Sequence, residues 1–180
     1  MDALVPAFIA ALLAGIADRP ARLAAELAAR SGVASVIAGL ILGHALAIAI
    51  SVAGALWIAQ MLAPNARSLL LAVALILAGV GALWRRRTMP ANGNAFLAAA
   101  AGGFVAGDGT AFLAFALAVK GSAPILAGVG ALAGASVLAG AAAMAGPDWR
   151  RLPLVWLGRI AGVVLLITGL IVALGALRLI

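Results

Sequence analysis

The sequence has little of what a water-soluble enzyme needs. Of its 180 residues none is cysteine, one is histidine and five are acidic, and only 9% are charged. The absence of cysteine excludes disulfides, thiol nucleophiles and thiolate metal sites. A soluble domain is about half apolar and about a quarter charged, whereas 67% of this chain is apolar. The composition therefore excludes the water-soluble globular class.

The length limits what a membrane protein of this composition can contain. A helix needs about 20 residues to cross the hydrocarbon core, so six spans use about 120 residues. The remaining residues suffice for short loops only. We therefore expect a single membrane domain over residues 1–180, without a soluble catalytic or nucleic-acid-binding domain.

The net charge of +7 has a simple explanation in a membrane protein. The basic residues stand singly or in short groups at the ends of apolar runs, which is the positive-inside pattern and not a nucleic-acid surface. The chain also has no Ser/His/Asp grouping, no His/Cys metal cluster and no glycine-rich phosphate loop, so we expect no enzyme and no cofactor. The expected partners are the lipid bilayer and a transported ion, without nucleic acid, and a homo-oligomer is left open.

Apolar runs bounded by charge, proline or polar clusters predict an all-α integral membrane protein with six transmembrane helices. Its halves repeat at a spacing of about 90 residues, and this spacing places Asp18 on Asp108 and Gly79 on Gly169. Each half holds three spans, an odd number, so the second repeat is predicted to be inverted. The predicted spans are residues 3–29, 33–61 and 67–84 in repeat one (1–90), and 94–119, 124–144 and 152–177 in repeat two (91–180).

The basic residues at the span ends predict the orientation. Six arginines follow spans one, three and five, whereas three basic residues lie at the other ends. The positive-inside rule then places both termini outside the cytoplasm, and so short a chain fits a bacterial inner membrane. The first group is Arg30, Arg85, Arg86, Arg87, Arg150 and Arg151, and the second is Arg67, Lys120 and Arg178.

Two aspartates are the strongest candidates for a functional site. Asp108 lies near the middle of the fourth span, where a charge costs several kcal/mol unless it is paired, hydrated or neutralised. Gly107 and Gly109 allow the helix to unwind there, so that carbonyls and the Thr110 hydroxyl become oxygen ligands for a cation. Asp18 has the matching place in the first span. The alternative is that each aspartate is protonated or hydrogen-bonded and only helps the helices to pack.

The residues after Asp18 distinguish the first span from the fourth. Pro20 disturbs a helix, and Arg19 can neutralise the neighbouring carboxylate, which gives it a gating role as one option. Charges then recur every four residues on one face. We expect this face to let the end of the span protrude from the membrane, and the alternative is an amphipathic interface helix over residues 18–30. The charged face consists of Asp18, Arg22, Glu26 and Arg30.

His44 stands near the middle of the second span. A lone buried histidine is more often a packed, hydrogen-bonding residue than a functional one. Because ionisable groups are costly in a membrane, a role in proton transfer or gating is the second interpretation.

Small and aromatic residues predict how the helices pack and where they end. Glycines at GxxxG spacing indicate close helix contacts, which depend on small residues in lipid. Tryptophans near the span ends are predicted to be interfacial anchors. The small residues are Gly39, Gly43, Ala47, Ser51, Gly130, Gly134, Gly158 and Gly162, and the tryptophans are Trp57, Trp84, Trp149 and Trp156.

The two aspartate segments resemble a motif of the small six-helix cation exchangers, a family that includes the Golgi manganese/calcium–proton exchangers and bacterial manganese exporters. The family motif is Glu-x-Gly-Asp-(Lys/Arg)-(Thr/Ser), once in the first helix of each inverted three-helix repeat. In this chain the segments read GIADRP over residues 15–20 and VAGDGT over residues 105–110. The resemblance implies that a divalent cation, manganese or calcium, binds at Asp18 and Asp108, with Gly107, Thr110 and Arg19 as further matches.

Several residues of this chain depart from the motif. Gly15 and Val105 replace the two glutamates, Pro20 replaces the first Thr/Ser, and Gly109 replaces the second basic residue. Dehydrated Mn²⁺ or Ca²⁺ takes about six or more oxygen ligands, so two carboxylates make a poorer site than four.

The expected function is that of a divalent cation–proton exchanger working by alternating access around two midplane aspartates. An exporter of a monovalent ion or a small organic solute on the same fold is the first alternative. The second alternative is a non-transporting membrane paralogue that assembles with a partner.

Overall fold

The computed structural model describes residues 3–16, 19–84, 94–106 and 108–178, and for Arg19, Ala106, Asp108 and Arg150 it describes the backbone only. Throughout this part of the chain the regular structure is helical, without a strand. The elements are α1 (Leu4–Gly15), α2 (Arg19–Ser31), α3 (Val33–Ala59), α4 (Pro64–Leu83), α5 (Ala95–Ala106), α6 (Asp108–Lys120), α7 (Pro124–Ala145), the 3-10 helix η1 (Gly146–Arg151) and α8 (Leu154–Ala176).

Four helices, α3, α4, α7 and α8, are each long and apolar enough to cross a membrane. They correspond to the predicted second, third, fifth and sixth spans. Pro64 and Pro124 begin α4 and α7, because proline fits the first helical turn, where its missing N–H would have no partner. The chain is therefore an all-α protein with the helices that a membrane protein needs.

The predicted first and fourth spans are each broken into two helices, near Pro20 and near the glycines that allow the fourth span to unwind. The helices α1 and α2, of 12 and 13 residues, bend by 68° at the break, and α5 and α6, again of 12 and 13 residues, bend by 47°. At 1.5 Å per residue each piece is about 18–20 Å long, too short for a hydrocarbon core of about 30 Å. Only as bent pairs do they bring the number of candidate spans to six.

The breaks lie where the sequence has glycine and proline. Pro20 is the second residue of α2, and it starts a new helix because it cannot continue the hydrogen bonding of α1. Gly107 separates α5 from α6, and Gly109 follows at the second position of α6. In both places the backbone has residues that favour interruption over a continuous helix.

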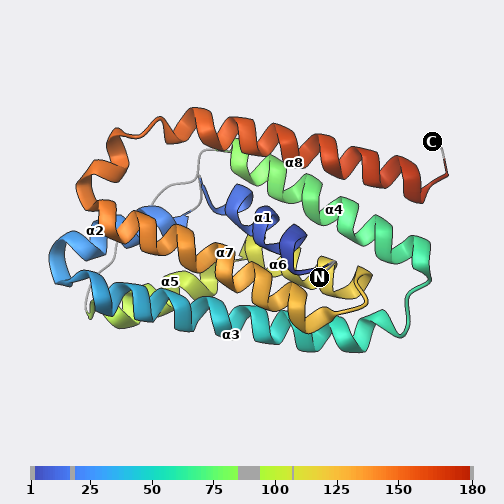
Figure 1. Ribbon diagram of the computed structural model, residues 1–180, viewed down its shortest axis with the longest axis horizontal. Coiled ribbons are helices and arrows are strands. Elements are labelled where there is room, and N and C mark those ends of the chain that lie inside the picture. Colours follow the sequence, from blue (N-terminus) through green and yellow to red (C-terminus); the bar gives the residue numbers. More distant parts are fainter. Residues whose placement is uncertain (1–2, 17–18, 85–93, 107, 179–180) are drawn as a thin grey trace.

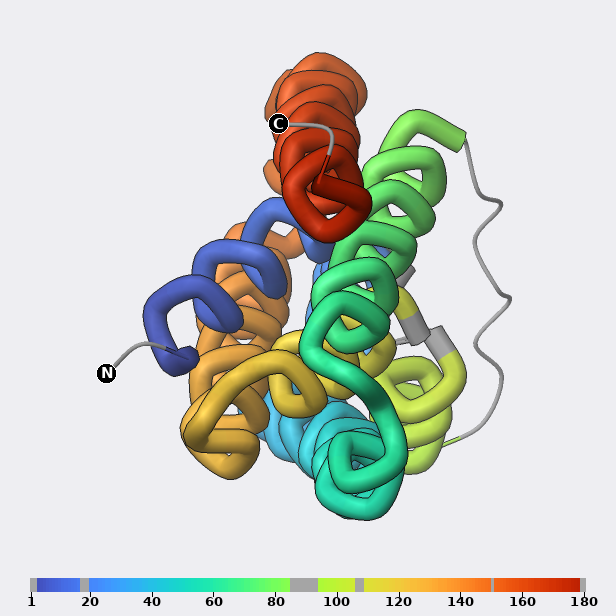
Figure 2. The backbone as a smooth tube through the Cα atoms, turned by 90° about the vertical axis from the view of Figure 1, so that its right-hand side faces the viewer, coloured from blue at the N-terminus to red at the C-terminus, as the bar shows by residue number. Residues whose placement is uncertain are grey.

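The long helices run along the molecule, and the half-helices α2 and α5 lie toward one end of it (Figure 1). The view along the long axis shows α8 beside α4 on one side, with α3, α5 and α7 on the other (Figure 2). Three pairs have the most extensive contacts: α4 with α8, α3 with α5, and α1 with α7. Each broken pair thus packs one of its halves on a long helix that comes from the other half of the chain.

Glycines allow these pairs to approach closely, which confirms the predicted role of the small residues. A Cβ added at Gly39 of α3 would lie 2.5 Å from the Phe96 carbonyl oxygen of α5. A Cβ added at Gly134 of α7 would lie 2.6 Å from the Phe8 carbonyl oxygen of α1. Real Cβ atoms do not come so close, so only glycine permits these contacts.

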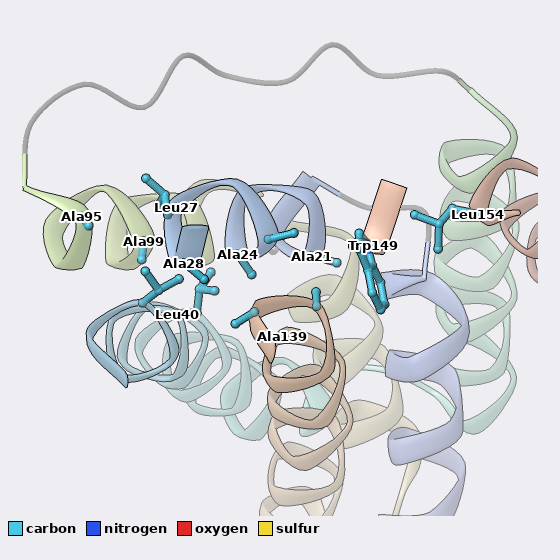
Figure 3. Close-up of a cluster of buried hydrophobic side chains, with 14 residues drawn as sticks. Ala21, Ala24, Leu27, Ala28, Leu40, Ala95, Ala99, Ala139, Trp149 and Leu154 are labelled. Carbon is cyan, nitrogen blue, oxygen red and sulfur yellow. The ribbon is translucent and has the colours of Figure 1, made fainter. Parts of the chain in front are cut away.

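One predicted interfacial anchor is wrong. Trp57, Trp84 and Trp156 are 64% to 75% exposed, as anchors at a lipid interface would be, but Trp149 is only 7% exposed. The reason is that η1 folds back against α2 and takes Trp149 into a buried cluster (Figure 3).

Candidate functional site

Two buried polar side chains, His44 and Thr110, mark the interior of the described bundle. His44 is 5% exposed and Thr110 is 3% exposed, in a core made largely of alanine and leucine. His44 Nδ1 lies 2.8 Å from the carbonyl oxygen of Leu40, one turn earlier in α3. A carbonyl oxygen only accepts hydrogen bonds, so Nδ1 carries the proton and donates a hydrogen bond to the Leu40 carbonyl oxygen.

Both side chains line one small pocket in the interior. Its space holds about one water-sized sphere, and it is lined by α1, α2, α3, α6 and α7. The lining residues are Ala11, Gly15, Pro20, Ala21, His44, Thr110, Ala135, Leu138 and Ala139.

The pocket lies at both helix breaks. Gly15 ends α1 before the first break, and Pro20 lies just after it in α2. Thr110 is the third residue of α6, directly after the second break. The fold thus brings together two chain interruptions that are about 90 residues apart in the sequence, and it places His44 beside them.

The predicted site residues are described to different extents. Thr110 and His44 are brought together in the pocket lining. Asp18 and Gly107 lie outside the described residues, and for Arg19 and Asp108 only the backbone is described, as the first residues of α2 and α6. The predicted roles of these four residues remain predictions. Among the side chains that are described, no group of three or more His, Cys, Asp and Glu residues comes together.

The helix α2 contributes Pro20 and Ala21 to the lining of the pocket. It lies across α3 and α7, and its alanines Ala24 and Ala28 lie near Leu40 of α3 and Ala139 of α7 (Figure 3). On its other face Arg30 is exposed. The predicted protruding end of a continuous first span is therefore replaced by a separate amphipathic helix, whose apolar face packs on the bundle.

Most of the lining escaped the sequence reasoning because it is apolar. Alanine carries no chemical signal, and Ala21, Ala135 and Ala139 were not distinguishable from other alanines of the chain. These alanines become informative when they are compared with the residues at matching places in the other half of the chain. Ala21 follows Pro20, the residue that matches Thr110 at the 90-residue spacing, and Pro20 also lines the pocket. Ala135 follows Gly134 of α7, as His44 follows Gly43 of α3, and both glycines pack on a half-helix.

The comparisons with known proteins give one finding. The model of the family described as divalent cation/proton antiporter GDT1 matches residues 3–90 of this chain. No curated protein and no solved structure shows a significant match. The family match confirms the resemblance to the cation exchangers over the first half of the chain, and the family is one of transporters.

Proposed function

From that family match and the pocket, we propose that this chain is a secondary transporter that exchanges a divalent cation, of the manganese or calcium type, for protons. Asp18 and Asp108 are the proposed cation ligands, with Thr110, the Gly107 carbonyl and His44 beside them. Arg19 is proposed to gate the site by pairing with Asp18 when the cation has left.

The position of the pocket at both helix breaks is the observation that carries this proposal. Broken helices at membrane depth are tolerated where they line a cavity, and transporters use the freed carbonyls and the helix ends to bind ions. Asp18 directly precedes α2 in the sequence, and Asp108 begins α6. Each aspartate therefore belongs to a chain interruption that reaches the same small space.

The packing pattern supports two inverted repeats. In the proposed correspondence α1 to α4 match α5 to α8, so the contact of α1 with α7 corresponds to that of α5 with α3. The contact glycines agree, since Gly39 and Gly43 of α3 pack on the Phe96 and Ala100 carbonyls, while Gly130 and Gly134 of α7 pack on the Leu4 and Phe8 carbonyls. Repeats of this kind provide alternating access by rocking against each other around a fixed site.

Proton coupling follows from the chemistry of the carboxylates. A carboxylate removed from water needs a positive partner, and it can take either a cation or protons. Release of the cation on one side and uptake of protons in its place would keep the charge of the site low while it reorients. This is the physical basis of an exchange.

The orientation is proposed from the charges and the ends of the chain. The start of α1 and the end of α8 face the same end of the molecule, while α2 and η1 meet at the opposite end (Figure 1). This end includes Arg30, in the last turn of α2, and the exposed Arg151 of η1. The positive-inside rule then places this end in the cytoplasm of a bacterium and the two termini outside.

The size of the pocket favours an ion over the organic solute considered as an alternative. A space of about one water molecule accepts a dehydrated ion. An amino acid or a similar solute needs a cavity of about 300 Å³ or more. The structure would therefore have to open widely to bind such a substrate.

Flux measurements in proteoliposomes test the proposal. We expect the purified chain to move Mn²⁺ or Ca²⁺ against an imposed proton gradient, and Asp18→Asn and Asp108→Asn each to reduce the flux at least about tenfold, because each removes half of the negative charge of the proposed site. Asp148→Asn is the matched control, since Asp148 is exposed and pairs with exposed Arg151, at 3.1 Å.

Three outcomes contradict the proposal. Unchanged flux in both site variants would remove the aspartates from the mechanism. Flux of Na⁺ or K⁺ in place of divalent ions would favour the monovalent exporter. No flux under any gradient, together with co-purification of another membrane subunit, would favour the non-transporting paralogue.

A further inference from the structure

His44, the single histidine of the chain, is buried in the pocket lining, and its Nδ1 is hydrogen-bonded to a backbone carbonyl. We infer that His44 Nε2 binds the transported ion directly, and that this nitrogen makes the site prefer later first-row transition-metal ions, such as Co²⁺ and Zn²⁺, over Ca²⁺. The inference rests on the proposed function, and it names the class of ion that the same pocket selects.

The first step of the argument is the state of the ring. Nδ1 donates to the Leu40 carbonyl at 2.8 Å, so in the neutral imidazole the lone pair is on Nε2. Metal-ligating histidines have the same arrangement, in which the other ring N–H is held by a backbone carbonyl or a carboxylate. This bond fixes both the tautomer and the orientation of the ring before any ion arrives.

The second step is the wall behind the ring. The helix α5 approaches α3 at Gly103, where an added Cβ would lie 2.8 Å from Leu40 O and 3.0 Å from His44 Nδ1. The backbone of α5 therefore covers the Nδ1 side of the imidazole. His44 also lines the pocket, and because Nδ1 is taken by Leu40, Nε2 is the ring nitrogen left for an ion.

The third step is the set of donors around the pocket. Ca²⁺ takes six to eight oxygen ligands, but this chain has neither motif glutamate, and Pro20 stands in place of a hydroxyl residue. Thr110 is the buried hydroxyl of the described lining. An imidazole nitrogen binds Zn²⁺, Co²⁺ and Ni²⁺ well and Ca²⁺ poorly. One nitrogen with two carboxylates therefore suits the transition-metal ions.

Because His44 is the only histidine, the inference can be tested on a single atom. The chain is produced with ¹⁵N-labelled histidine and without a histidine tag, and Mn²⁺ is bound as a paramagnetic probe. Electron spin-echo modulation is expected to show histidine nitrogen coupling to Mn²⁺, with a change between ¹⁴N and ¹⁵N samples. Bound Mn²⁺ without nitrogen coupling would overturn the inference.

A binding series with Ca²⁺, Mn²⁺, Co²⁺ and Zn²⁺ gives the second readout. We expect affinity to rise along this series, and His44→Gln to weaken Co²⁺ and Zn²⁺ binding about tenfold or more while Ca²⁺ changes less than about twofold. Thr110→Val is the matched variant, because it removes the other buried polar group of the pocket and an oxygen donor. It is expected to weaken Ca²⁺ at least as much as Co²⁺.

The outcomes separate this inference from the proposed function. If His44→Gln and the wild type have the same ion preference while Asp18→Asn and Asp108→Asn abolish flux, the inference fails and the exchanger stands. If nitrogen coupling is found but no ion is transported, the metal site stands and the exchanger fails. An unfolding temperature of His44→Gln close to that of the wild type ensures that lost binding is not lost folding.

Discussion

The two halves of the molecule have nearly the same scaffold but different chemistry. The half-helices α1 and α5 have 12 residues each, and α2 and α6 have 13 each. After the second break stands Thr110, and at the matching motif position after the first break stands Pro20. In the long helices the first half of the chain supplies the polar residue, because His44 lies in α3 and Ala135 lies at the corresponding place in α7.

This difference shows how a symmetric fold can make an asymmetric site. All four residues line the pocket, and each half supplies one polar group where its counterpart supplies an apolar side chain. A cation in the pocket would therefore meet the imidazole from one half and the hydroxyl from the other. The helix contacts that hold the scaffold are similar in the two halves, whereas the residues that line the pocket differ.

The helix contacts provide the most severe test of this comparison. Gly39→Ala in α3 and Gly130→Ala in α7 each place a methyl group against a backbone carbonyl, of Phe96 and Leu4 respectively. We expect both variants to lose about 1–3 kcal/mol of stability, because backbone cannot move aside as a side chain can. Thermal unfolding in detergent measures the loss.

Each helix contains its own control for this prediction. A Cβ at Gly140 of α7 meets nothing within 4 Å, and one at Gly54 of α3 meets only Phe115 at an ordinary 3.7 Å. Gly140→Ala and Gly54→Ala are expected to be neutral or slightly stabilising. A loss at Gly39 without a comparable loss at Gly130 would break the proposed equivalence of the halves.

The connections after α3 and α7 differ in how much their arginines are expected to contribute to stability. Arg67 donates to the carbonyl oxygens of Leu62 at 3.0 Å and Ala59 at 2.6 Å, and so ties the end of α3 to the start of α4. Arg67→Gln is expected to cost about 1–2 kcal/mol, because a partly buried charged donor to helix-end carbonyls is lost. Arg151→Gln is the control, since that arginine is exposed and its ion pair adds little. Equal unfolding temperatures for the two variants would contradict this role of Arg67.

The connection after α7 should tolerate the loss of a polar group. Trp149 Nε1 is buried and, in the described structure, has no hydrogen-bond partner. Trp149→Phe removes an unsatisfied donor but leaves a small void, so the stability is expected to change by less than about 1 kcal/mol. Trp149→Ala should cost about 3 kcal/mol, because the cluster with α2 loses its largest side chain. A large loss in Trp149→Phe would mean that the N–H has a partner in the membrane-embedded protein.

The long helices were predictable from sequence because apolar runs and proline positions depend on local residues. The runs around α3, α4, α7 and α8 end at the charged, glycine or proline residues that bound them in the structure. The helix-disturbing residues Pro20 and Gly107 could also be recognised in the sequence, but the size of the bend that accompanies them could not. Whether such residues bend a helix, and by how much, depends on what packs against it, so the two bends of 68° and 47° came only from the structure.

The wrong prediction for Trp149 and the unrecognised pocket alanines have the same cause. Trp149 looked like its three exposed relatives because it stands near a span end, and only the turn of η1 onto α2 buries it. The pocket alanines carried no signal because an alanine in a core is indistinguishable from one in a site. Long-range contacts decided both.

The sequence alone determined that this protein belongs in a membrane, and it determined which residues are too costly to be there without a partner. The few charges and the single histidine stand out because the bilayer offers them no water. Only the tertiary structure decided that His44, Thr110 and the two helix breaks share one small pocket. These residues come from elements distant in the chain, and only the close approach of glycine-bearing helices brings them together.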